Sequence, residues 1–167
     1  MALGEVGLTE PRGRNDHPRI LDYHGSVSKG LAKMRPVQPY CASFVWFCYT
    51  KSGVRPVKVP NPARARDWFR VPSRVVMTQQ SLRGNRRMMK MPQRGDVIGY
   101  IFQSRNWAIS HIEILDRIDI DEGYIYAIGA NTSSRSAAVS VSREGDGVYF
   151  VRRKIKSFYQ ISNPLAP

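Results

Sequence analysis

The feature that most constrains the fold is the stretch Tyr40–Tyr49, which contains only aromatic, aliphatic, sulfur-containing and small side chains. A run of about ten residues is too short to cross a bilayer, and apolar side chains on nearly every side are typical of a buried helix. Pro39 favours a helix start here, because its missing N–H group would have no partner in the first turn. We therefore predict a central buried helix with Cys41 in its first turn and Gly53 just beyond its end.

The position of Cys41 at a helix start suggests a nucleophile. Unpaired backbone N–H groups and the positive end of the helix dipole favour the thiolate there. A thiolate nucleophile needs a base, and the base needs an orienting partner. His111 begins a predicted strand and is the candidate base, while Asn131 ends the next strand and is the candidate orienting residue. Taken singly, each residue also has a structural interpretation: a buried cysteine, a core or surface histidine, and a turn asparagine.

The second cysteine, Cys48, lies on the same predicted helix. Seven residues of helix separate it from Cys41 by roughly 10 Å, which is too far for a disulfide. The sequence contains neither a C-x-x-C nor an H-x-x-x-H spacing, so we expect no zinc site and no other metal. Cys48 is interpreted as a small buried apolar residue.

Local patterns predict helices in the first half of the chain and strands in the second. Besides the cysteine helix, we expect a helix over residues 17–24, capped by Asn15 or Asp16, and a short helix over 63–69. The expected strands cover residues 96–102, 111–118, 124–128 and 148–153, with a weaker strand beginning at Ala137.

This order of elements predicts one α+β domain over residues 1–167, with helices packed on a small antiparallel sheet or half-barrel. The helical part should cover about residues 1–90 and the sheet part about residues 95–155. On strand alternation, His111 shares a face with Glu113, and Asn131 shares a face with Gly129. A helix carrying the cysteine across that face would bring the thiol to the imidazole.

The charge balance limits the partners. Lys and Arg number 26 against 13 Asp and Glu, which gives a net charge of +13 and a pI near 10.3. Such a surface attracts polyanions, whether nucleic acid, anionic lipid or an acidic wall polymer. The densest basic stretch covers residues 83–94, where Arg86 and Arg87 are candidate substrate contacts and a solvated loop is the alternative interpretation. No run of eighteen apolar residues occurs, so we expect no membrane span.

Four segments, Pro39–Val45, Arg94–Ile98, Ser110–Ile114 and Ile128–Ser133, together carry a resemblance to a known family. They are similar to the nucleophile helix Pro-Trp-Cys-Ala-x-Phe-Val, the Gly-Asp-Ile/Val strand entry, the Gly-His-Val-Gly-Ile strand and the Glu/Gly-Gly-Asn segment of one group of enzymes. That group is the CHAP branch of the NlpC/P60-like cysteine peptidases and amidases, which cut peptidoglycan. The resemblance extends over most of residues 3–155.

The resemblance implies a papain-like α+β fold, with Cys41 as nucleophile, His111 as general base and then acid, and Asn131 as orienting residue. It also implies a peptidoglycan hydrolase that cuts the muramoyl-L-alanine bond or a stem or cross-bridge peptide bond, with no cofactor. Gln38 is the side-chain candidate for the oxyanion site, because papain-like enzymes place a glutamine ahead of the cysteine.

Three departures from the family pattern concern the surroundings of this set. Tyr40 replaces the usual tryptophan and is itself a candidate substrate contact. Ser110 and Glu113 replace glycines beside the histidine, and Gly129 stands where some members have a glutamate. Glu113 is a candidate replacement for that carboxylate, although its place two residues along the strand favours a solvent-facing side chain.

The first fifteen residues are polar and do not form a signal peptide, so we expect synthesis in the cytoplasm. A phage lysin released by lysis or an antibacterial effector delivered by specialised secretion fits this expectation, with an immunity or delivery protein as a candidate partner. We expect a monomer that does not act on nucleic acid. One alternative is a non-catalytic basic module that binds wall polymer or nucleic acid on the same fold. Another is a cysteine peptidase or transferase that acts on protein.

Overall fold

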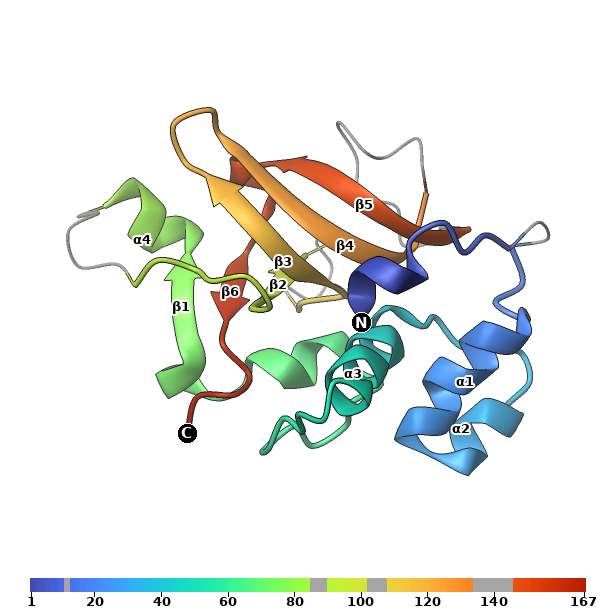
Figure 1. Ribbon diagram of the computed structural model, residues 1–167. Coiled ribbons are helices and arrows are strands. Elements are labelled where there is room, and N and C mark those ends of the chain that lie inside the picture. Colours follow the sequence, from blue (N-terminus) through green and yellow to red (C-terminus); the bar gives the residue numbers. More distant parts are fainter. Residues whose placement is uncertain (11–12, 85–89, 102–107, 134–145) are drawn as a thin grey trace.

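The predicted cysteine helix is α3 (Cys41–Lys51), and it crosses one face of an antiparallel β-sheet (Figure 1). The computed structural model describes residues 1–10, 13–84, 90–101, 108–133 and 146–167. Eight consecutive residues of α3, from Cys41 to Cys48, are buried, as the uniformly apolar sequence predicts. Gly53 follows the helix with a φ of 76°, a left-handed conformation that glycine adopts without steric strain.

In the part of the chain that the structure describes, the sheet has six strands in the order β1-β6-β2-β3-β4-β5, and every neighbouring pair is antiparallel. The strands are β1 (Val75–Thr78), β2 (Val97–Tyr100), β3 (His111–Asp119), β4 (Tyr124–Thr132), β5 (Gly147–Lys154) and β6 (Gln160–Ser162). The α+β class is therefore confirmed. The expected division into a helical part up to about residue 90 and a sheet part of 95–155 is wrong, because β1 and β6 lie outside that range. β1 and β6 are too short to show an alternation of apolar and polar residues in the sequence. They are defined only by their pairing, β1 with β6 and β6 with β2.

The described residues form three further α-helices, which are α1 (Pro18–Val27), α2 (Lys29–Lys33) and α4 (Gln79–Arg83). The cap of α1 differs from the prediction of Asn15 or Asp16: the Nδ1 atom of His17 accepts a hydrogen bond from the Arg19 N–H at 3.1 Å. Asn15 has a φ of 56° and its N–H donates to Glu10, so the chain is still in a turn there. Within the described ranges, no helix combines the length and apolar character needed to cross a membrane.

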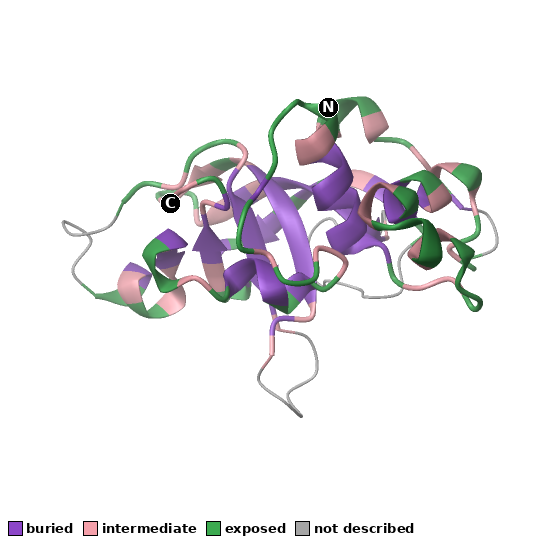
Figure 2. Ribbon diagram, turned by 90° about the horizontal axis from the view of Figure 1, so that it is seen from below, coloured by how far each residue is buried: buried purple, intermediate pink, exposed green. Residues whose placement is uncertain are grey.

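The sheet has an apolar core on each face. The α3 face buries a cluster with side chains from the helices and four strands, including Tyr23, Phe44, Val97, Ile112, Ile128 and Val148. The opposite face buries a second cluster, including Met77, Ile98, Leu115, Ala127, Val151 and Ile161. Figure 2 shows the result: buried residues concentrate in α3 and the central strands, while exposed residues occupy the peripheral helices.

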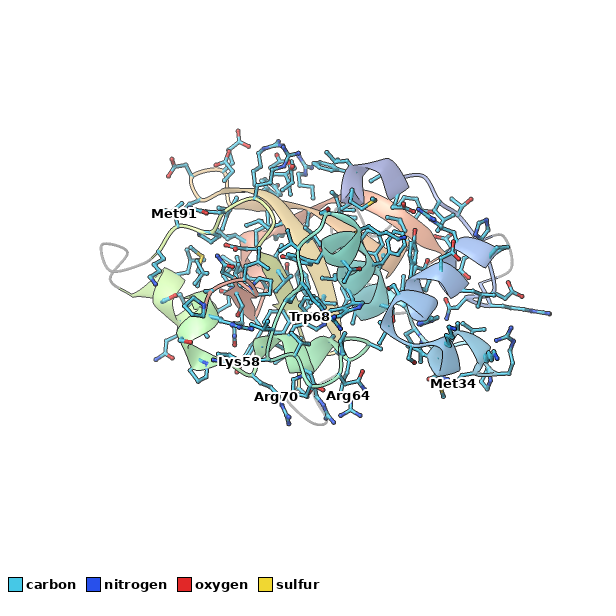
Figure 3. All side chains as sticks on the ribbon, turned by 60° about the horizontal axis from the view of Figure 1, so that its bottom comes forward. Met34, Lys58, Arg64, Trp68, Arg70 and Met91 are labelled. Atoms are coloured by element: carbon cyan, nitrogen blue, oxygen red, sulfur yellow. The ribbon has the colours of Figure 1, made fainter. Side chains whose placement is uncertain are left out.

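The predicted helix over residues 63–69 is a 3-10 helix, Ala65–Phe69, which fixes the other flank of α3. Trp68 is 2% exposed and makes ring contacts with Trp46 and Tyr49 of α3. Figure 3 shows Trp68 in the interior beside α3, with Arg64 and Arg70 on the periphery. Ala137, from which the sequence predicts a weaker strand, lies outside the described residues.

The central place of α3 predicts a large energetic effect from its core side chains. Phe44→Ala should lower the free energy of unfolding by about 3–5 kcal/mol, because the ring is fully buried and its removal leaves a cavity. Val57→Ala, at a site that is 55% exposed, should change it by less than about 0.5 kcal/mol. Urea unfolding followed by circular dichroism measures both. A loss below about 1 kcal/mol for Phe44→Ala would contradict the central packing of α3.

Candidate active site

Cys41 is the first residue of α3 and is 6% exposed. The thiol lies within hydrogen-bonding reach of the His111 side chain and of the backbone N–H groups of Ala42 and Ile112. N–H groups of a first helical turn have no partner inside the helix, so they are available to a negative charge. The structure thus places the predicted nucleophile beside the predicted base. The expected face is wrong, because α3 packs on the face of β3 that carries Ile112 and Ile114, and alternation puts His111 on the opposite face.

The electrostatics of this pair favour a charged thiolate and a charged imidazolium. Burial by itself would raise the pKa of the Cys41 thiol, but His111 and the two N–H groups lower it below the ordinary value. Burial would lower the pKa of His111, but hydrogen bonding and charge interactions with Cys41 and Glu113 raise it to about 9. Both shifts have the directions expected for an activated cysteine.

Glu113 is the main correction to the sequence analysis. The prediction of a solvent-facing side chain is wrong: Glu113 is fully buried, and its Oε1 lies 3.3 Å from His111 Nε2. Burial opposes ionisation of this carboxyl, but Arg153 and His111 hold its pKa well below the usual range. The alternative that it replaces a missing carboxylate therefore fits the geometry.

The space for Glu113 comes from the neighbouring strand. Glu113 of β3 is the register partner of Gly129 of β4. A Cβ atom on residue 129 would lie 2.7 Å from Glu113 Oε1, closer than Cβ atoms approach an atom to which they are not bonded. The carboxylate therefore occupies the volume that a side chain at position 129 would fill.

Arg153 is a site residue that the sequence analysis missed. It is 2% exposed, and its Nη2 donates to Glu113 Oε1 at 2.6 Å and to Thr132 Oγ1 at 3.1 Å. The signal was present in the alternation of β5, where Val151 and Arg153 are buried and Arg152 is exposed. An arginine at an inward position implies a buried anionic partner.

Asn131 lies at the end of β4 and is 2% exposed. Its φ is 56°, and the register of β4 with β5 shifts between Ala130 and Thr132. Strict alternation, on which its predicted face depends, does not hold across such a bulge. The Asn131 backbone lies beside the buried phenol of Tyr40, and the hydroxyl of Thr132, the next residue, accepts from Arg153.

The remaining predicted contacts have other environments. The side-chain amide of Gln38 donates to the Pro36 carbonyl at 2.9 Å. Tyr40 is fully buried next to Glu10, so its side chain belongs to the core and presents no surface to a substrate. Arg86 and Arg87 lie outside the described residues.

The sequence did not predict a second contact, in which His24 holds the segment that precedes Cys41. His24 of α1 is fully buried, with its Nε2 3.0 Å from the Gln38 carbonyl oxygen and its Nδ1 3.0 Å from Ser43 Oγ. Burial lowers the pKa of His24, which favours a neutral ring, and a neutral ring can make both contacts. The second cysteine, Cys48, is a free thiol that is 4% exposed, and burial raises its pKa to about 12.

No cluster of three or more His, Cys, Asp or Glu side chains suited to a metal ion occurs in the part of the chain that the structure describes. No protein-family model, curated protein or solved structure matches this chain. The function of this chain is therefore inferred from the arrangement of Cys41, His111, Glu113 and Arg153.

The two thiols of α3 should react very differently. In a Cys48→Ala variant, iodoacetamide should alkylate Cys41 below pH 8.5, the pKa of an ordinary cysteine, because the thiolate is already present there. In a Cys41→Ala variant, Cys48 should stay unmodified while the protein is folded. Mass spectrometry of the labelled protein between pH 5 and 9 measures both rates. A Cys41 rate that rises only with a midpoint at or above pH 8.5 would contradict the activated thiol.

Proposed function

We propose that this protein is a cysteine hydrolase of amide bonds, with Cys41 as nucleophile, His111 as acid and base, and Glu113 as the residue that orients His111. The observation that carries the proposal is the buried series from the Cys41 thiol through His111 to the Glu113 carboxylate. A free thiol with a lowered pKa at a helix start has no structural purpose in a core.

The mechanism is acyl transfer in two steps. The Cys41 thiolate attacks the carbonyl carbon, and the imidazolium of His111 gives its proton to the departing amine as the C–N bond breaks. Neutral His111 then takes a proton from water, which attacks the thioester, and the carboxylate product leaves as the thiolate returns. Because Glu113 engages Nε2, the other ring nitrogen, Nδ1, serves the thiol.

The oxyanion of each tetrahedral intermediate needs hydrogen-bond donors already in place. We assign this role to the backbone N–H of Cys41 in the first turn of α3. The Gln38 amide is turned toward the Pro36 carbonyl, which makes it the weaker candidate. Asn131 remains a candidate second polar partner at the end of β4.

The substrate that we propose is peptidoglycan, cut at the muramoyl-L-alanine bond or within a peptide. Two features support this: the segments similar to the CHAP branch of NlpC/P60-like enzymes, and a net charge of +13, which suits an anionic wall. A helix with an N-terminal cysteine laid across an antiparallel sheet is compatible with the papain-like arrangement of that group. Release by phage lysis or delivery as an antibacterial effector are the routes that we propose to the wall.

The charge favours a second candidate function, a basic module that binds wall polymer without cutting it. This reading explains the excess of Lys and Arg, but it leaves the buried Cys41, His111 and Glu113 series without a purpose.

Digestion of purified peptidoglycan tests the proposal. The wild type and Cys48→Ala should release fragments, whereas Cys41→Ala and His111→Ala should lose activity by about 10³-fold or more, because each removes a reacting group. Mass spectrometry of the fragments identifies the new termini and thus the bond. If the wild type releases nothing from any wall preparation while all variants sediment with it, the hydrolase is contradicted and the binding module is supported.

A further inference from the structure

We propose that Arg153 is a positioning residue, which holds the Glu113 carboxylate in the space above Gly129 so that it faces His111. This inference rests on the proposed function, because it concerns the residues that set the reactivity of Cys41. β5 is an edge strand of the sheet and lies two strands from β3, and Arg153 gives it a part in setting the reactivity of Cys41.

The geometry begins with three strands that lie side by side, β3, β4 and β5 (Figure 1). Glu113 comes from the first, Gly129 from the second and Arg153 from the third. The guanidinium reaches over β4 and donates to Glu113 Oε1 through both Nη2, at 2.6 Å, and Nε, at 3.2 Å, while Nε also lies 3.5 Å from Oε2. Two donors on one planar group fix the direction of a carboxylate as well as its charge.

Gly129 makes this reach possible. A Cβ on residue 129 would lie 2.7 Å from Glu113 Oε1, 3.1 Å from Cδ of the same carboxylate, and 3.2 Å from Thr132 Cγ2. A side chain at this position would therefore push the carboxylate away from its present place between His111 and Arg153. Thr132, which follows the bulge in β4, accepts from Arg153 Nη2 and steadies the guanidinium from the other side.

The electrostatic need for Arg153 follows from burial. A fully buried carboxyl group without a cation would take up a proton, and a neutral Glu113 would no longer stabilise a charged imidazolium. The charged and titratable groups that face it are Arg153 of β5, His111 of β3, Tyr100 of β2 and, through His111, Cys41 of α3. Arg153 is the permanent cation among them.

Without the guanidinium, the pKa of Glu113 rises, the imidazolium loses its anionic partner, and the pKa of His111 falls. A less charged His111 stabilises the Cys41 thiolate less, so the pKa of the thiol rises. The acid limb of Cys41 reactivity, which is the pH range where the alkylation rate falls as the thiolate is protonated, should therefore move to higher pH.

The test is the pH dependence of Cys41 alkylation, with Cys48→Ala present throughout so that one thiol is observed. Arg153→Met should move the acid limb up by about one pH unit or more, which is a tenfold lower rate on that limb. Arg153→Lys, which keeps the charge and loses the planar fork, should give a smaller shift. Gly129→Ala should shift the limb in the same direction as Arg153→Met. Arg152→Met, an exposed neighbour on β5, is the matched control and should leave the limb unchanged.

A double-mutant cycle separates positioning from a general structural role. In a Glu113→Gln background, Arg153→Met should produce no further shift, because the carboxylate that it holds is gone. The double variant also removes both buried charges, so it should fold even where Arg153→Met alone does not. Circular dichroism and unfolding curves verify folding for every variant.

The outcomes are distinct. Two results would overturn this inference and leave the proposed function standing, provided that the wild-type acid limb lies at low pH. One is an acid limb that Arg153→Met leaves unchanged. The other is an acid limb that Arg153→Met shifts equally with and without Glu113→Gln. Where Arg153→Met does not fold, an unchanged limb in both Arg153→Lys and Gly129→Ala would do the same. A wild-type limb at the ordinary cysteine pKa would overturn the proposed function and this inference with it.

Discussion

The rest of the structure depends on the burial of α3. A helix that is apolar on nearly every side must be covered all round, and the chain covers it with the sheet on one face, α1 on another, and Trp68 on a flank. Eight buried residues in sequence leave this helix little freedom to shift along its axis. Its first residue is therefore held against the start of β3, where His111 lies. The placement of thiol against imidazole is a consequence of apolar packing.

The polar groups at that meeting point form a series in which each charge compensates its neighbour. A favoured thiolate on α3, an imidazolium and a carboxylate on β3, and a guanidinium on β5 alternate in sign. Isolated charges at 6% exposure or less would be strongly unfavourable, and the alternation is what makes the burial tolerable. His24 does not belong to this series of charges. It connects the segment before Cys41 to α1, and its lowered pKa favours a neutral ring.

The sequence predicted the features that have strong local signals. The long apolar stretch predicted α3 with Cys41 at its start, and the separate pattern of residues 111–118 predicted a strand that begins at His111. Features that depend on pairing were not accessible. The burial of Glu113 requires both Gly129 across the strand and Arg153, which is 40 residues away, and alternation alone cannot say that a face is covered. The bulge at Asn131 and the short strands β1 and β6 likewise become visible only through their partners.

One helix carries two thiols with opposite reactivity, so their labelling rates report on two different states of the protein. Cys48 lies in the apolar core, 4% exposed, with a pKa raised to about 12, so we expect its labelling to follow the opening of the core around α3. Cys41 instead reports the closed arrangement, because its reactivity requires His111 beside it. The ratio of labelling at the two sulfur atoms thus compares the population of the folded site with that of the opened core within a single molecule.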